Sequence, residues 1–302
     1  MIISVHTGAH ATHSHLLLRA LLRNKAVLAA QGVEVPGPGR YRQILPQVVS
    51  RLRGARASAD SCEMLVDMLS DQDEAARIVL SYENILADGA NIFRKGGFYA
   101  NAPARLRALR NVFPQAQVEF HISLREPGHW LQALSQALSE ADGLQYDSLL
   151  AGNDPAQISW AALITAIKSA LPETELTVWC AEDAPLICPA ILQRIAGVTE
   201  GPNEGLNEGL TLTGSLDLIA GQLNPEGLRR LRLWLAQNPP TSENERRQVL
   251  RAFLDKYARP ETPAPQTTLP GWDPVLQQQL RDNYQRDQQT IAAMDGVTFL
   301  TA

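Results

Sequence analysis

The stretch IISVHTGAHATHSH, residues 2–15, gives the clearest indication of the fold class. Residues 2–6 form an apolar run that ends at a turn containing Gly8, and residues 14–31 then favour a helix with a broad apolar face. A buried strand that passes through a glycine turn into a helix is typical of a parallel α/β sheet. We therefore expect the loop after residue 6 to lie at the carboxyl edge of such a sheet.

The same alternation of strand and helix continues to about residue 200. Further apolar runs predict strands at residues 77–81, 118–124 and 176–180. Helices are predicted between them, at residues 44–53, 61–69, 103–112, 127–138, 158–171 and 190–195. Strands separated by helices pair in parallel through crossovers, so the prediction is a three-layer α/β fold with helices on both faces of the sheet.

The last third of the chain is predicted to be helical. Helices are expected at residues 224–237 and 243–257, the second beginning at a capping-box spacing of Ser242 and Glu245. A Pro-rich linker, residues 259–270, precedes a final helix that starts near residue 273. We expect one domain over residues 1–302, with an α/β core at about 1–200 and a helical region at about 203–302.

Composition excludes several classes of protein. The net charge of −5 argues against a nucleic-acid-binding surface. No stretch reaches the ~18 apolar residues of a membrane helix. The N-terminus shows no basic leader followed by an apolar core, so no secretory signal is expected. The three cysteines, Cys62, Cys180 and Cys188, have no metal-like spacing, and their odd number does not suggest a disulfide framework. The expected location is the reducing cytoplasm, without a membrane or nucleic-acid partner.

The loop after the first predicted strand is a candidate anion site. Gly8 permits a tight turn, and Thr12 and Ser14 supply hydroxyl groups at the start of the following helix. Free backbone N–H groups and the helix dipole at such a start favour anions. The ordinary phosphate-loop pattern Gly-x-x-x-x-Gly-Lys-Ser/Thr is absent.

This region resembles bacterial sulfotransferases, whose pattern is a strand followed by His-x-Gly-x-x-Lys-Thr-Gly-Thr-Thr. The matching residues are His6, Gly8, Thr12, Asn24, Gly32-Val33 and Pro36-Gly37. The resemblance implies a P-loop-type fold that binds 3′-phosphoadenosine 5′-phosphosulfate and transfers its sulfuryl group to a small-molecule or carbohydrate hydroxyl. Ala11 stands in place of the lysine, His13 in place of the glycine, and Ser14 and His15 in place of the threonine pair.

The resemblance also implies roles for residues at two other strand ends. Glu83, after residues 77–81, matches a glutamate that is a candidate general base for the acceptor hydroxyl. Arg125 and Ser135 match the arginine and serine that bind the 3′-phosphate, and a guanidinium offers paired donors to phosphate oxygens. His10 and His13, when protonated, are candidates to replace part of the missing lysine charge.

Neutral histidines are also candidate metal ligands. All six lie at or beside two strand ends, but no cysteine or acidic residue joins them in a known spacing, so no metal is expected. At the C-terminus, Tyr284 and Asp287 fall in a pattern that resembles the end of bacterial sulfotransferases, Tyr-x-x-Asp followed by Ile291, Met294 and Gly296-Val297.

Three functions remain open from the sequence. The first is an active sulfotransferase, in which loss of one preorganised donor costs ~2.7–4 kcal/mol, or roughly 10²–10³ in rate. The second is a non-catalytic binding or regulatory protein with the same fold. The third, a nucleotide-dependent kinase, is disfavoured by the absent Gly-Lys-Ser/Thr and by the lack of a magnesium-binding acid after a strand. The acceptor and the oligomeric state are not determined.

Overall fold

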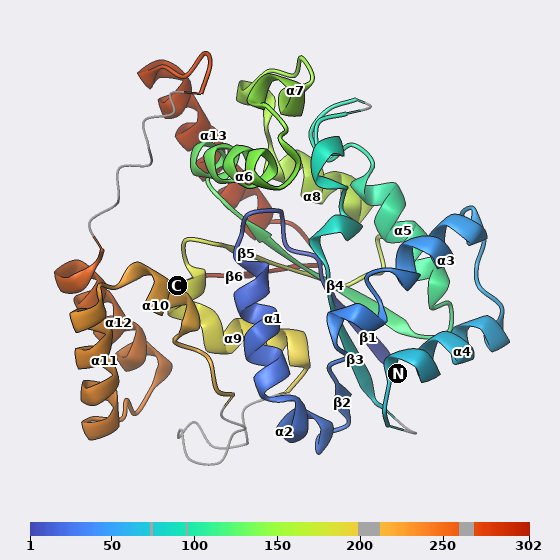
Figure 1. Cartoon of the computed structure of the whole chain (residues 1–302), viewed down its shortest axis with the longest axis horizontal. Helices are drawn as coiled ribbons and strands as arrows, with labels where there is room; N and C mark the ends of the chain where they lie inside the picture. The colour runs from blue at the N-terminus through green and yellow to red at the C-terminus, as the bar shows by residue number, and fades with distance from the viewer. Residues whose placement is uncertain (73–74, 95, 199–211, 260–268) are drawn as a thin grey trace.

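A computed structural model describes residues 1–72, 75–94, 96–198, 212–259 and 269–302 (Figure 1). Its centre is a six-stranded sheet of order β2-β3-β1-β4-β5-β6, in which every neighbouring pair is parallel. The strands are β1 (Ile2–His6), β2 (Val33–Glu34), β3 (Arg77–Ser81), β4 (Gln117–Leu124), β5 (Leu176–Cys180) and β6 (Val297–Leu300). The strands predicted at residues 2–6, 77–81, 118–124 and 176–180 are confirmed.

Helices cover both faces of the sheet, so the predicted three-layer α/β fold is confirmed. One face packs against α1 (Ser14–Arg23), α2 (Lys25–Ala29), α9 (Ala184–Ala196) and α10 (Asp217–Gln222). The other packs against α3 (Ile44–Leu52), α4 (Ala59–Leu69), α5 (Ala102–Val112), α6 (Pro127–Asp142), α7 (Tyr146–Leu150), α8 (Trp160–Ala170) and α13 (Pro274–Ala292). Both layers bury continuous apolar clusters, which is what a sheet covered on two sides requires.

The direction in which the chain leaves each strand defines where a ligand fits. From β1 the chain turns to α1 on one face, whereas from β3 and β4, the two neighbours of β1, it turns to helices on the opposite face (Figure 1). The loops therefore diverge at the carboxyl ends of β1 and β4. Crevices of this kind are where open α/β sheets bind their ligands.

The C-terminal third adds a small helical unit. Helices α11 (Pro225–Gln237) and α12 (Glu243–Tyr257) lie side by side and share a cluster of apolar residues with α10, which includes Ile219, Leu231 and Leu250. At the start of α12 the Ser242 hydroxyl accepts the Glu245 N–H at 3.2 Å, as the capping box predicts. Most of the predicted linker, residues 260–268, lies outside the described residues.

Several elements differ from the sequence prediction. Strands β2 and β6 were not predicted, and β6 places a strand at the end of the region expected to be helical. The helix expected over residues 14–31 is broken at Asn24, whose side chain instead bonds Thr213. The helix expected at residues 190–195 begins earlier, and Pro189 lies inside α9, which is kinked at Ile187.

No helix within the described ranges is long and apolar enough to cross a membrane.

Candidate functional site

The loop after β1 folds down onto the end of β4. The backbone N–H groups of Thr7 and Gly8 both donate to the His121 carbonyl oxygen, at 3.0 and 3.3 Å, and the Ala9 N–H donates to the Ser123 carbonyl oxygen at 3.0 Å. These donors are therefore satisfied inside the protein. The N–H groups of residues 7–9 are therefore not available to a bound phosphosulfate.

Gly8 and Thr12 hold this loop in shape. Gly8 has a φ of +57°, and a Cβ at this position would lie 2.3 Å from the Ser14 Oγ. The Thr12 hydroxyl donates to the Ala9 carbonyl oxygen at 2.6 Å and lies 2.5 Å from the Ser123 hydroxyl. The positive φ and the close approach together explain why only glycine fits at residue 8. Gly8 and Thr12 therefore both stabilise the loop, and their predicted binding of the cofactor stays a prediction.

His10 points into the protein and not toward a ligand. Its backbone N–H donates to the Tyr99 hydroxyl at 3.2 Å, its Nδ1 lies 2.7 Å from the same hydroxyl, and its Nε2 lies 3.0 Å from the Asn84 Oδ1. The Asn84 oxygen accepts, so Nε2 carries the proton and Nδ1 accepts from Tyr99. Burial lowers the pKa of His10, more than its hydrogen bond to Asn84 raises it. The prediction that His10 supplies a positive charge is corrected: it is a neutral, buried group.

His13 lines a cavity of about 260 Å³, but its imidazole is uncharged at neutral pH. It lies immediately before α1 with a φ of 61°, and its side chain makes no capping hydrogen bond to the helix. Desolvation, followed by the nearby Arg125 guanidinium, lowers the pKa of His13 below its ordinary value. His13 therefore contributes an uncharged imidazole, which corrects the expectation of a cation.

Arg125 follows β4 at the same edge and lines a cavity of about 260 Å³. Its NH1 donates to the Ala11 carbonyl oxygen at 2.8 Å, which is its one side-chain hydrogen bond within the described residues. The polar lining comprises Thr12, His13, Arg125, Glu182 and Gln222, and the apolar lining includes Leu16, Leu17, Pro185 and Leu218. The structure therefore brings three of the predicted site residues, Arg125, Thr12 and His13, to one cavity, and their binding of a cofactor stays a prediction.

The peptide group between Arg125 and Glu126 is fixed at both ends. The indole N–H of Trp160 donates to the Arg125 carbonyl oxygen at 2.8 Å, and the Glu126 N–H donates to the Glu182 Oε1 at 2.8 Å. The other oxygen of Glu182 accepts the Tyr284 hydroxyl at 2.9 Å. Neither Glu182 nor Trp160 was predicted as a site residue, because these contacts join segments far apart in the sequence.

Ser135 does not lie with Arg125. It lines a separate cavity of about 420 Å³ together with Gln132, Ser139 and Tyr146. Ser135 is eight residues beyond Pro127, the first residue of α6, and a helix rises ~1.5 Å per residue, so the serine is about 12 Å further along the axis. The predicted pairing of Arg125 and Ser135 on one phosphate is therefore corrected.

Glu83 lies in a short 3-10 helix (Glu83–Ile85) directly after β3, at the same edge of the sheet. Its carboxylate is partly buried and makes no hydrogen bond or ion pair within the described residues. It is close enough to His10 to affect the titration of that ring. Glu83 does not line the Arg125 cavity, and its role as a general base stays a prediction.

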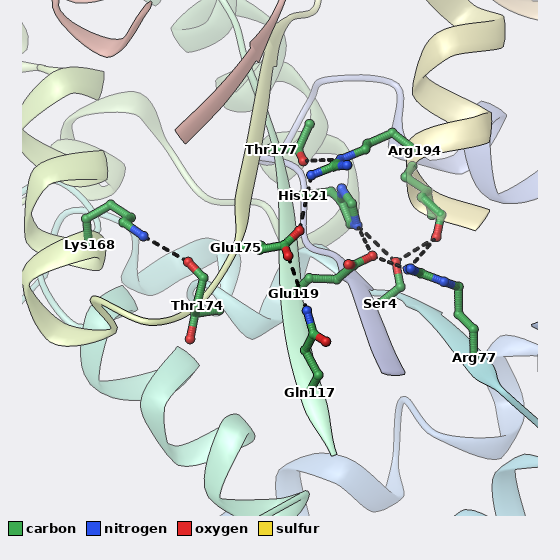
Figure 2. A network of polar contacts seen from close by, with 11 residues as sticks. Ser4, Arg77, Gln117, Glu119, His121, Lys168, Thr174, Glu175, Thr177 and Arg194 are labelled. Carbon is green, nitrogen blue, oxygen red and sulfur yellow. Dashed lines mark hydrogen bonds and ion pairs between the residues drawn. The ribbon is translucent and has the colours of Figure 1, made fainter. Parts of the chain in front are cut away.

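A buried polar network crosses the sheet beneath α9 (Figure 2). Glu119 forms an ion pair with Arg77, and the His121 Nε2 lies 3.2 Å from the Glu119 Oε1 and 2.9 Å from the Ser4 Oγ. This resembles a serine–histidine–acid triad, but one ring nitrogen faces both partners and the Ser4 hydroxyl donates to the Ile195 carbonyl oxygen at 2.7 Å. The network therefore cannot relay a proton from the serine to the acid and is structural.

The acidic member of this network is held ionised. Burial by itself raises the pKa of Glu119, but hydrogen bonds from His121 and Arg77 lower it to about 2. Within the ranges that the structure describes, no group of three His, Cys, Asp or Glu side chains is placed to hold a metal ion.

Known proteins show little similarity to this chain. No family model matches the sequence, and no curated protein matches it. Among solved structures, the chain is similar to the crystal structure of a sulfotransferase from Alicyclobacillus acidocaldarius, with a TM-score of 0.42 and 10% identity, over 83% of this chain and 95% of that one. A similarity of this size assigns neither a family nor an activity to the chain.

Proposed function

We propose that this protein binds the phosphate group of a nucleotide of the 3′-phosphoadenosine 5′-phosphate type in the Arg125 cavity, without efficient sulfuryl transfer. The observation behind the proposal is that Arg125, held in place by its own peptide group, lines a cavity beside the start of α1. The choice of nucleotide follows the sequence resemblance at residues 6–15 and 125.

The chemistry of the cavity suits one phosphate. A guanidinium offers a planar set of donors that matches phosphate oxygens, and the uncapped start of α1 adds a favourable dipole. The volume of about 260 Å³ is smaller than the ~300–1,000 Å³ of pockets that enclose a whole ligand. The cavity would therefore hold a phosphate-bearing end of the nucleotide, with the remainder outside.

The loop after β1 explains why we favour binding over catalysis. Transfer of a sulfuryl group needs donors arranged around the oxygens that become more negative in the transition state. Here the N–H groups of residues 7–9 bond β4, the Thr12 hydroxyl bonds the loop itself, and Ala11 has no donor in its side chain. His10, buried and neutral, does not replace the missing charge.

Sulfuryl transfer to a small-molecule or carbohydrate hydroxyl is the second candidate. It is favoured by Glu83, whose carboxylate lies after β3 at the same edge and forms no internal hydrogen bond or ion pair within the described ranges. An unpaired carboxylate there is available to accept a proton from an acceptor hydroxyl. The Glu83→Gln variant would then lose transfer activity while keeping nucleotide affinity.

Isothermal titration calorimetry with 3′-phosphoadenosine 5′-phosphate tests the proposal, with adenosine as the control that lacks phosphate. We expect the bisphosphate to bind with an affinity that falls as salt rises, because the contact is largely ionic. Adenosine should not bind measurably. A radiolabelled-donor assay in parallel separates binding from transfer. Absence of bisphosphate binding at low salt would overturn the proposal.

We also propose a cytoplasmic location. Cys62, Cys180 and Cys188 are all buried and unpaired. Free thiols persist in reducing compartments and are oxidised or paired elsewhere. Cell fractionation followed by thiol labelling of the denatured protein would test this, and a disulfide-linked or exported form would contradict it.

A further inference from the structure

Arg125 has two carboxylates near it and is paired with neither. Glu126 is its neighbour in the chain, and Glu182 lines the same cavity. Both carboxylates act electrostatically on the Arg125 guanidinium, yet within the described residues neither forms an ion pair with it. An arginine this close to two acids ordinarily pairs with one of them, so something must hold both carboxylates elsewhere.

The Glu126 carboxylate caps the N-terminus of α6. Its Oε1 accepts the Gly128 N–H at 3.0 Å, and its Oε2 accepts the His129 N–H at 2.8 Å. The same Oε2 lies 3.0 Å from the His129 Nδ1. Both oxygens are therefore engaged in capping this helix.

Glu182 is held by two other donors. Its Oε1 accepts the Glu126 N–H at 2.8 Å, and its Oε2 accepts the hydroxyl of Tyr284, which comes from α13 about a hundred residues later in the chain, at 2.9 Å. Tyr284 is buried, with 5% of its surface exposed. Burial raises the pKa of the Tyr284 phenol, so the hydroxyl keeps its proton and remains a donor.

This arrangement has a direct consequence for ligand binding. A carboxylate with a free oxygen next to a partly buried guanidinium gains a charge-assisted hydrogen bond by turning toward it. An external anion would then have to displace that carboxylate before it could bind. Because the Glu126 N–H and the Tyr284 hydroxyl hold the Glu182 carboxylate in place, the positive charge of Arg125 stays available to the cavity.

We propose that Tyr284 is a positioning residue that holds the Glu182 carboxylate away from Arg125, so that Arg125 serves an external anion. The inference rests on the anion site proposed above, and it adds a determinant of affinity that lies on the C-terminal helix. Tyr284 itself does not line the cavity, and its hydroxyl reaches the ligand site through its hydrogen bond to Glu182.

The Tyr284→Phe substitution removes the hydroxyl and leaves the ring. We expect the affinity for 3′-phosphoadenosine 5′-phosphate to fall roughly 10-fold or more, the scale set by hydrogen bonds to charged groups. Adding Glu182→Gln to this variant should restore the affinity to within about 2-fold of wild type or better, because a neutral amide does not compete for the guanidinium. A purely structural role of the tyrosine would give no such rescue.

The control variant is Tyr146→Phe. Tyr146 is also largely buried, and its hydroxyl accepts the Trp272 indole N–H at 3.3 Å, away from Arg125. It should leave nucleotide affinity unchanged. An unchanged affinity in Tyr284→Phe, or a double variant as weak as the single one, would overturn the inference while leaving the anion site intact.

A ligand-free measurement separates this inference from the proposed function. In a crystal structure of Tyr284→Phe we expect a Glu182 oxygen within hydrogen-bond distance of the Arg125 guanidinium. If the wild type does not bind the nucleotide, the proposed function fails, but the new ion pair would still support the positioning role. A Glu182 side chain that stays in place in Tyr284→Phe would contradict it.

Discussion

The indole N–H of Trp160 donates a hydrogen bond to the carbonyl oxygen of Arg125 over 2.8 Å. Trp160 is the first residue of α8, and its backbone N–H in turn donates to the Asp287 Oδ2 on α13 at 2.6 Å. A second buried indole, that of Trp130, donates to the His10 carbonyl oxygen at 2.8 Å. The two loops at the crevice are thus each fixed by a tryptophan, and α13 anchors one of them.

Replacing Trp160 with phenylalanine should destabilise the protein markedly. The substitution leaves a cavity in a fully buried site and an unsatisfied carbonyl oxygen at Arg125. We expect the free energy of unfolding to fall by about 2–4 kcal/mol. Urea denaturation would measure it, with Trp234→Phe on the partly exposed α11 as the control. Equal losses in the two variants would contradict the anchoring role.

Gly8→Ala should lower the free energy of unfolding more than Gly54→Ala does, although both glycines have a positive φ. Gly8 has a φ of +57° and no room for a Cβ, whereas Gly54 has a φ of +87° and open space around it. Gly54→Ala should cost only the backbone penalty of about 1–2 kcal/mol. Gly8→Ala should exceed that by more than ~1 kcal/mol, because the loop must move away from Ser14. Denaturation midpoints that shift equally would show that the loop relaxes freely.

Buried histidines should make the protein sensitive to acid. Burial, and then the neighbouring His121, lower the pKa of His6 from 6.5 to about 3. Between these values the unfolded chain binds a proton that the native state does not. The free energy of unfolding therefore falls as pH drops below 6.5, by up to ~1.4 kcal/mol per pH unit for this group, and this group contributes no pH dependence above 6.5.

The His6→Asn variant isolates this effect. Carboxylates titrate in the same range, but they are common to the variant and the wild type. Urea denaturation at pH 7, 6, 5 and 4 should show a shallower loss of stability in His6→Asn, with His15→Asn at the exposed start of α1 as the control. Parallel curves for wild type and His6→Asn would mean that His6 takes up a proton as readily in the native state as in the unfolded chain, which would contradict its lowered pKa.

The sequence predicted the sheet better than the site. Short segments rich in apolar residues predicted β1, β3, β4 and β5, whereas β2 has only two residues and no periodicity to detect. Strand β6 is defined by its pairing with β5, a contact between distant segments. Arg125 could be predicted as a site residue because ligands bind at the carboxyl ends of strands. The orientation of His10 and the distance of Ser135 from Arg125 depend on tertiary packing, which a single sequence motif does not specify.

Ala11→Lys tests what the loop lacks. A lysine at this position adds a cation beside the start of α1, near the carbonyl group that bonds Arg125. We expect nucleotide affinity or sulfuryl transfer to rise at least ~10-fold, since one added donor at an anionic centre is worth this much or more. The φ of 58° at residue 11 is equally unfavourable for alanine and for lysine. The substitution should therefore not lower the stability of the fold through the backbone. No gain in either quantity would show that the loop cannot serve the anion.

The central claim is that Arg125 binds an external phosphate, and a comparison of two arginine variants tests it most directly. Each variant loses one positive charge, Arg125→Ala in the cavity and Arg56→Ala at an exposed position of the loop between α3 and α4. Calorimetric titration with 3′-phosphoadenosine 5′-phosphate compares their affinities with that of the wild type. We predict that Arg125→Ala weakens binding by ~1.5–3 kcal/mol and that Arg56→Ala leaves it unchanged. Equal affinities for Arg125→Ala and wild type would contradict the account.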